Sequence, residues 1–144
     1  MSRNDEQIEA VREANATFYH AVESLDIRKM DPLWAKGEHV RCIHPGWSTR
    51  SGWREVRDSW VTIFNNTRAI RFAVDDVHVY LAGSLAWVVC LENIESDDGE
   101  RWVESQVLAT NLFENRDGRW LMIHHHGSPV FTTFQDAGSE EAFE

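Results

Sequence analysis

Residues 85–127, LAWVVCLENIESDDGERWVESQVLATNLFENRDGRWLMIHHHG, decide the fold of this chain. The stretch opens with a nearly continuous apolar run over 85–94, which is typical of a strand covered on both faces. A polar loop then separates this run from a second predicted strand over 102–113. The pair Asp117-Gly118 is a strong short hairpin signal, and it predicts a return into a last strand over 120–127.

The chain before this stretch contains one more predicted strand of the same sheet, and the residues before that strand are mainly predicted to be helical. Residues 70–80 alternate and are rich in β-branched side chains, which predicts another strand. Apolar residues at three- and four-residue spacing predict a helix over 5–25. A second short helix is expected over 26–37, a strand over 40–44 and a third helix over 53–65.

Helices gathered at the front and antiparallel strands at the back predict a single α+β domain over residues 1–144. Its core is expected over 8–129. The acidic, small-residue-rich tail over 135–144 is predicted to be disordered.

Composition narrows the classes of function. The 144 residues carry 24 acidic and 14 basic side chains, a formal net charge of −10, and no basic patch, so nucleic acid is disfavoured as a partner. No stretch approaches the roughly 18–20 apolar residues of a membrane span, and no secretory signal opens the chain, which predicts a cytoplasmic protein with no membrane association. Cys42 and Cys90 lie in apolar runs and are expected to be reduced core residues.

Two sets of motifs carry a family resemblance. His44-Pro45-Gly46 is followed by Ser51-Gly52 and a helix, and the segment 117–120 leads to His124–Ser128. With these motifs the chain resembles the cone-shaped nuclear transport factor two-like fold, in its SnoaL-like branch, over about 8–129. That group includes ketosteroid isomerase, polyketide cyclases, scytalone dehydratase and the association domain of calmodulin-dependent kinase. The resemblance implies three helices packed on a strongly curved, mostly antiparallel sheet that forms a cone with one pocket, and it specifies activity poorly.

The resemblance makes His44 the candidate catalytic residue. In ketosteroid isomerase the catalytic aspartate ends the first strand immediately before a proline, and here His44 precedes Pro45. An imidazole can exchange a proton near neutral pH, so we expect His44 to act as general acid/base. The alternative is a structural histidine that caps the turn at Pro45.

The partners expected from the isomerase are not matched. The resemblance places Phe18 where its tyrosine would be, with Tyr19 one residue further along, and Thr110 where its protonated aspartate would be. Phenylalanine donates no hydrogen bond and threonine is a weak substitute, so steroid-isomerase activity is disfavoured. Tyr19, Thr110 and His125 are left as possible hydrogen-bond partners of a ligand.

The run His124-His125-His126 alternates on a strand, and the isomerase-like register sends His125 into the cone. A register error of one residue reverses this assignment. Two histidines on one face plus His44 have the residue types of a catalytic zinc site, but the spacing is not diagnostic and we predict no metal. No Gly-rich phosphate loop or dinucleotide fingerprint is present, so no organic cofactor is expected.

Seven tryptophans favour a thick core, a pocket wall or an interface. We expect some of them to line a pocket that takes a flat, apolar or aromatic small molecule, although helix–sheet packing explains them as well. The predicted ligand-binding residues are Phe18, Tyr19, Trp34, Trp47, Trp60, Thr110 and His125.

The leading hypothesis is a small-molecule pocket protein, with a cofactor-independent isomerase, cyclase or dehydratase as the catalytic form. The alternative is a non-catalytic ligand-binding or assembly module like the kinase association domain. That likeness implies a homodimer through the sheet face opposite the pocket, with Trp87, Trp102 and Trp120 as candidate contacts. A divergent metal-dependent oxygenase or hydrolase is a third possibility.

Overall fold

The structure, a computed structural model, describes residues 2–131. Its elements are α1 (Arg3–Ser24), α2 (Ile27–Met30), the 3-10 helix η1 (Asp31–Leu33), β1 (Arg41–Ile43), β2 (Arg50–Ser51), α3 (Gly52–Asn65), β3 (Ala69–Ala82), β4 (Leu85–Asp97), β5 (Trp102–Arg116) and β6 (Arg119–Pro129). The tail predicted to be disordered, 135–144, lies outside the described residues.

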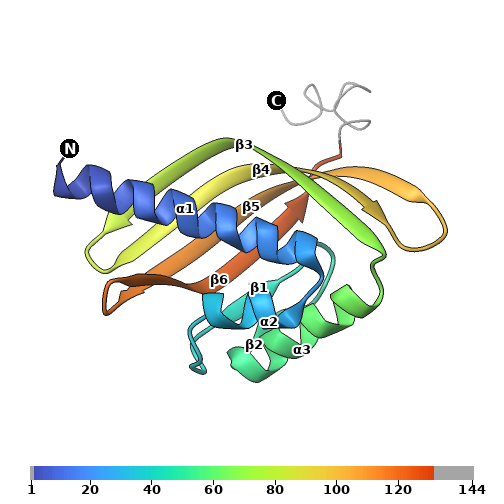
Figure 1. Cartoon of the computed structure of the whole chain (residues 1–144), viewed down its shortest axis with the longest axis horizontal. Coiled ribbons are helices and arrows are strands. Elements are labelled where there is room, and N and C mark those ends of the chain that lie inside the picture. Colours follow the sequence, from blue (N-terminus) through green and yellow to red (C-terminus); the bar gives the residue numbers. More distant parts are fainter. Residues whose placement is uncertain (1, 132–144) are drawn as a thin grey trace, which may run out of the picture.

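The strands form one sheet in the order β2-β1-β6-β5-β4-β3. β1 runs parallel to β6 and every other neighbouring pair is antiparallel. The long strands curve around α1, which lies across the concave face, while α2 and α3 gather beside β1 and β2 (Figure 1). The predicted α+β cone, with three helices on a curved and mostly antiparallel sheet, is confirmed.

Helix α1 has clear start and packing signals. The Ser2 side chain accepts a hydrogen bond from the Asp5 amide, and the Asp5 carboxylate accepts one from the Ser2 amide, which is a capping box. Val11, Phe18 and Val22 recur on one face and are buried against the sheet. Burial of such a face stabilises the helix more than its intrinsic propensity does.

Two short elements differ from the sequence-based prediction. The helix expected over 26–37 stops at Met30 and continues only as the 3-10 turn η1. Pro32 explains this, because its nitrogen has no hydrogen to continue the α-helical ladder. In addition, β2 pairs with β1 inside a segment for which the sequence predicts only a loop.

The β5–β6 hairpin sets the register of the site. Asp117 and Gly118 both have positive φ, 54° and 87°, as a type I′ turn requires. A bulge then leaves Ile123 without a directly opposite residue, because the partner of Leu112 is His124 and the partner of Phe113 is Met122. Beyond the bulge, His125 lies opposite Asn111.

The sheet has two unlike faces. On β4 and β5 the residues that face α1 are buried, whereas their alternate neighbours on the outer face include large exposed apolar side chains. Cys42 and Cys90 are both buried and unpaired. Within residues 2–131, none of the helices combines the length and the apolar character that crossing a membrane requires.

Candidate active site inside the cone

Five buried polar side chains gather inside the cone. α1 contributes Asn15 and Tyr19, while Glu92, Asn111 and His125 come from the inner faces of β4, β5 and β6. None is more than 4% exposed. Buried polar groups of this kind are costly unless each finds a hydrogen-bond partner.

These five side chains satisfy one another in a continuous network. The Asn111 amide nitrogen donates to Asn15 Oδ1 at 2.9 Å and to Tyr19 Oη at 3.2 Å. Asn111 Oδ1 lies 2.6 Å from His125 Nδ1 and accepts its hydrogen. Tyr19 in turn donates to Glu92 Oε2 at 2.5 Å. The network therefore has a direction, and it places a hydrogen on Nδ1 of His125.

Burial changes the acidity of each group in this network. It raises the pKa of Glu92 to about 7, against the opposing effect of the Tyr19 hydrogen bond. Burial, helped by the nearby Glu92 charge, raises the pKa of Tyr19. Burial and the neighbouring histidines lower the pKa of His125 to about 3. Near neutral pH only Glu92 is therefore poised to gain and lose a proton.

His44 sits next to this network, at the end of β1. Its Nε2 lies 2.9 Å from Ser59 Oγ, and Ser59 donates its own hydrogen to the Val56 carbonyl at 2.6 Å. Ser59 can therefore only accept from His44, which places the imidazole hydrogen on Nε2. Burial, with a smaller contribution from the positive charge of Arg50, lowers the pKa of His44 to about 4.

Aromatic rings close the space around the two histidines. Trp60 meets His44 edge-to-face at 4.7 Å between ring centroids, and Trp47 does the same at 4.9 Å. The His44 and His125 rings are 6.3 Å apart, and Phe18 lies 5.0 Å from His125. The structure thus brings six of the sequence-predicted residues together: Phe18, Tyr19, His44, Trp60 and His125 are buried, and Trp47 is partly exposed beside them.

The interior opens through a cleft between α1 and β3. This cleft of about 390 Å³ is lined by Arg12, Asn15, Ala16, Tyr19, His20, Glu23, Phe72, Val74 and Val77. Asn15 and Tyr19 belong both to the cleft lining and to the buried network, so the network lies directly behind this wall of the cleft. His44 is absent from the cleft lining.

Two predicted pocket residues lie elsewhere. The expectation that Thr110 faces the cone is wrong: Thr110 pairs with His126 on the outer face, and its buried neighbour Asn111 faces inward. Trp34 is buried beneath α2 and η1, where its Nε1 hydrogen points at Met30 Sδ at 3.3 Å and its ring packs against Trp53.

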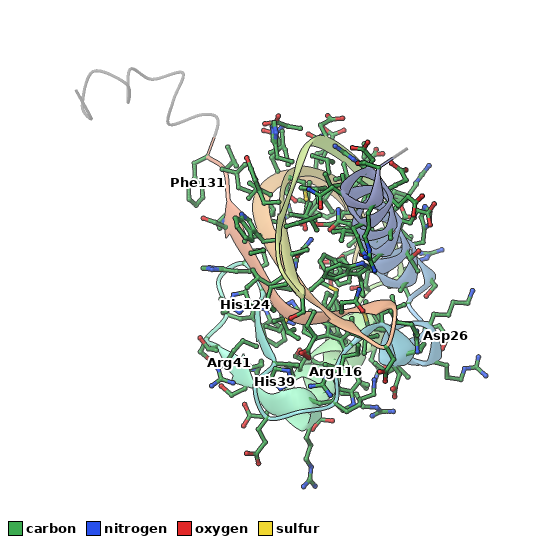
Figure 2. All side chains as sticks on the ribbon, turned by 90° about the vertical axis from the view of Figure 1, so that its left-hand side faces the viewer. Asp26, His39, Arg41, Arg116, His124 and Phe131 are labelled. Atoms are coloured by element: carbon green, nitrogen blue, oxygen red, sulfur yellow. The ribbon has the colours of Figure 1, made fainter. Side chains whose placement is uncertain are left out.

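The histidine run is arranged as the predicted register requires. His125 is buried inside the cone, while His124 and His126 lie on the outer face with their rings 6.4 Å apart. Figure 2 shows His124 and Arg41 on the side of the sheet away from α1. His44 cannot share a metal with these outward histidines. Within residues 2–131, no three His, Cys, Asp or Glu side chains form a group that could hold a metal ion.

Sequence reasoning assigns no role to Glu92 or Asn111, and it overlooks Asn15 and Ser59. A usable signal exists for the two strand residues. Glu92 has the same strand parity as Ala86, Val88 and Cys90, all of which are buried. A polar residue on the apolar side of an alternating strand points into the core, where it needs a partner.

Comparison with known proteins identifies the family. The model of the SnoaL-like domain matches residues 11–132. The chain belongs to the SnoaL-like domain family. A proposed dehydratase of the NTF2-like family from Streptomyces avermitilis is 39% identical, superposes with a TM-score of 0.84, and is matched over 89% of this chain and 99% of its own.

Two further proteins that resemble this SnoaL-like domain are of other kinds, a kinase association domain and an F-box protein. A proposed calcium/calmodulin-dependent protein kinase type II association domain from Thiobacillus denitrificans is 28% identical, with a TM-score of 0.70 over 82% of this chain and 93% of its own. The F-box protein SKIP8 of Arabidopsis thaliana is 33% identical over 119 residues, which are 83% of this chain and 49% of that protein. The chain therefore spans about half the length of this curated relative.

Tyr19 and Glu92 form a hydrogen-bonded pair inside the SnoaL-like domain, and Tyr19 also belongs to the lining of the cleft. Asn111, which also donates to Asn15 Oδ1, donates a hydrogen bond to the phenol oxygen. Preorganised donors of this kind stabilise charge that develops on a substrate oxygen, since they need no reorientation during reaction.

Proposed function

We propose that this SnoaL-like domain is a cofactor-independent proton-transfer enzyme, a dehydratase or isomerase, that acts on a small and largely apolar molecule held between α1 and β3. One observation carries this proposal. Tyr19 is one of the residues that line the cleft, and its hydroxyl donates a 2.5 Å hydrogen bond to Glu92, whose pKa burial raises to about 7. An acid/base with a pKa near the working pH is the most effective proton carrier.

Tyr19 and Glu92 together can catalyse a dehydration without a cofactor. In the first step a C–H proton next to a substrate carbonyl passes to Tyr19 Oη, while the Tyr19 proton passes to the Glu92 carboxylate. In the second step the proton returns through Tyr19 to the substrate hydroxyl, the C–O bond breaks, and water leaves as the C=C bond forms. Tyr19 and Glu92 end as they began, and the phenol is never a free anion, which its raised pKa requires.

His44 is a positioning residue in this proposal. Its hydrogen is held by Ser59 and its pKa of about 4 makes it a weak base. Its ring and Trp60 pack beside His125, which fixes the orientation of Asn111. The sequence-based prediction that His44 itself is the general acid/base is the competing assignment.

A β-hydroxy ketone that bears a phenyl ring tests both assignments, because losing water turns it into a strongly absorbing conjugated enone. We expect the protein to accelerate this loss, and we expect Tyr19→Phe and Glu92→Gln to remove the acceleration. Glu100→Gln, in the exposed loop between β4 and β5, is the matched control for the carboxylate. Full activity in Tyr19→Phe together with loss in His44→Gln would transfer the role to His44.

A second candidate function is assembly, and the outer face of the sheet favours it. Large exposed apolar side chains gather there, and Tyr80 and Trp87 stack with ring centroids 5.3 Å apart. Apolar patches of this kind on a small domain usually mark an interface. We propose a homodimer through this face, formed by Tyr80, Leu85, Trp87, Val89 and Leu108.

A further inference from the structure

One stripe of α1 forms the polar wall of the cleft. Arg12, Asn15, Tyr19 and Glu23 follow one another at three- and four-residue spacing, so they share one face of the helix. The opposite wall comes from β3 and is apolar, with Phe72, Val74 and Val77. A ligand in this cleft therefore meets polar groups on one side only.

Of the two charged side chains at the ends of this stripe, Glu23 is already bound by the protein and Arg12 is free to bind a ligand. The Glu23 carboxylate accepts a hydrogen bond from the Phe72 amide at 2.8 Å, so it is already engaged by the protein. Arg12 lies exposed at the other end, and none of the ion pairs among residues 2–131 includes it. Glu9 and Glu13 neighbour it on the helix and are also exposed, yet neither is paired with it. The free guanidinium marks a positive end in a chain whose net charge is −10.

The spacing between the two ends fits one small molecule. Arg12 and Tyr19 are seven residues apart on a continuous helix, which corresponds to about 10 Å along its axis. The extended reach of an arginine side chain shortens this span further. A compact apolar skeleton can therefore touch both residues while it rests on Phe72 and Val74.

We propose that the cleft selects ligands that carry a carboxylate, with Arg12 binding the carboxylate, β3 contacting the apolar body and Tyr19 facing the opposite end. Guanidinium and carboxylate match in geometry and form paired, charge-assisted hydrogen bonds. The assignment of the Tyr19 end to the reacting atoms rests on the proton-transfer function proposed above. The binding role of Arg12 does not depend on it.

Naphthoate and its uncharged amide, naphthamide, are suitable probes, because they share the apolar body and differ in charge. We expect calorimetric titration to show naphthoate bound about fivefold more tightly than naphthamide at low salt, a modest ratio because Arg12 is exposed. Added salt should reduce this preference. Arg12→Gln should abolish the preference and leave naphthamide affinity unchanged, and Arg12→Lys should retain part of it.

Arg54→Gln is the matched control, since it removes the same charge from an exposed position on α3. This variant should keep the preference of about fivefold for naphthoate. Equal affinity of the wild-type protein for the two probes, no binding of either, or an unchanged preference in Arg12→Gln would overturn the proposal.

The two proposals fail separately. Tyr19→Phe should abolish dehydration while it keeps naphthoate binding. If Tyr19→Phe retains full activity but Arg12→Gln loses the carboxylate preference, the proton-transfer mechanism fails and the carboxylate site stands. If Arg12→Gln keeps the preference while Tyr19→Phe is inactive, the carboxylate site fails and the mechanism stands.

Discussion

Tyr19 on α1 and Glu92 on β4 are 73 positions apart in the sequence and share a 2.5 Å hydrogen bond inside the cone. Each group is costly to ionise in that place, because burial raises the pKa of both. A phenol that donates to a carboxyl group with a pKa near neutrality can pass a proton without either partner holding an isolated charge for long. This relationship connects the fold to the proposed chemistry.

Glu92→Gln should change how stability depends on pH. The pKa of Glu92 rises from 4.5 to about 7 on folding, so between these values the folded state holds a proton that the unfolded state releases. The free energy of unfolding contributed by Glu92 therefore falls as pH rises through this window. Relative to the Gln variant, the wild-type protein should lose roughly 2–3 kcal/mol of stability between about pH 5 and about pH 8. Urea unfolding at several pH values measures this difference.

The two buried histidines provide the internal control for that experiment. The pKa of His44 and of His125 is lowered from 6.5, so their contribution to stability has the opposite sign and is lost as pH falls below 6.5. Both proteins contain them, so subtracting the two stability curves cancels their effect. Parallel curves for the wild type and Glu92→Gln would show that Glu92 keeps an ordinary pKa in the folded state.

Asn111 and Thr110 are adjacent on β5 but face opposite sides of the sheet, and their substitution should differ accordingly. Asn111→Leu removes the hydrogen-bond partners of His125 Nδ1 and Asn15 Oδ1 and one of the partners of Tyr19 Oη, and it should cost about 3 kcal/mol of unfolding free energy. Thr110→Val should change it by less than about 1 kcal/mol. Urea denaturation of both variants measures the contrast. A larger loss in Thr110→Val would mean that the inward register of β5 is wrong.

The fold is predictable because local signals agree with one another. Asp117 and Gly118 adopt the positive φ values that the hairpin signal implies. The prediction that the apolar run at the start of β4 is covered on both faces is wrong, because its inner face is buried but Leu85, Trp87 and Val89 are exposed on the outer face. The second helix is predicted too long, because the prediction follows the apolar spacing and ignores Pro32, which ends the α-helix in the structure. Signals of chain geometry, such as proline, decide element ends more reliably than apolar spacing does.

The candidate site is predictable only in part. The sequence places His125 correctly, but the resemblance places Thr110 inward. That assignment is off by one residue along β5, where Val107, Ala109, Asn111 and Phe113 are the buried positions. Alternation along β5 itself identifies Asn111 without any counting. The cleft depends on how α1 lies across β3, and no local pattern in the sequence encodes that angle.

The two buried histidines should be found in opposite tautomers. Ser59 accepts from Nε2 of His44, and Asn111 accepts from Nδ1 of His125. Since burial lowers both pKa values to about 4 and about 3, both rings should remain neutral at about pH 5.5. Nitrogen NMR of the imidazole rings distinguishes the tautomers and follows their titration. Two identical tautomers, or rings that protonate near pH 6.5, would contradict these hydrogen-bond directions.

The proposed homodimer can be tested at Leu108, which is 51% exposed on the outer face of β5. Burying a lysine there without a partner is costly, so Leu108→Lys should raise the dimer dissociation constant at least about 100-fold. Val103→Lys is the matched control, because Val103 lies on the same strand with the opposite parity and is 39% exposed. Sedimentation equilibrium at micromolar concentration should show a dimeric wild type, a monomeric Leu108→Lys and a dimeric Val103→Lys. A monomeric wild-type protein would exclude the sheet face as a stable interface, and a dimeric Leu108→Lys would move the interface elsewhere on the domain.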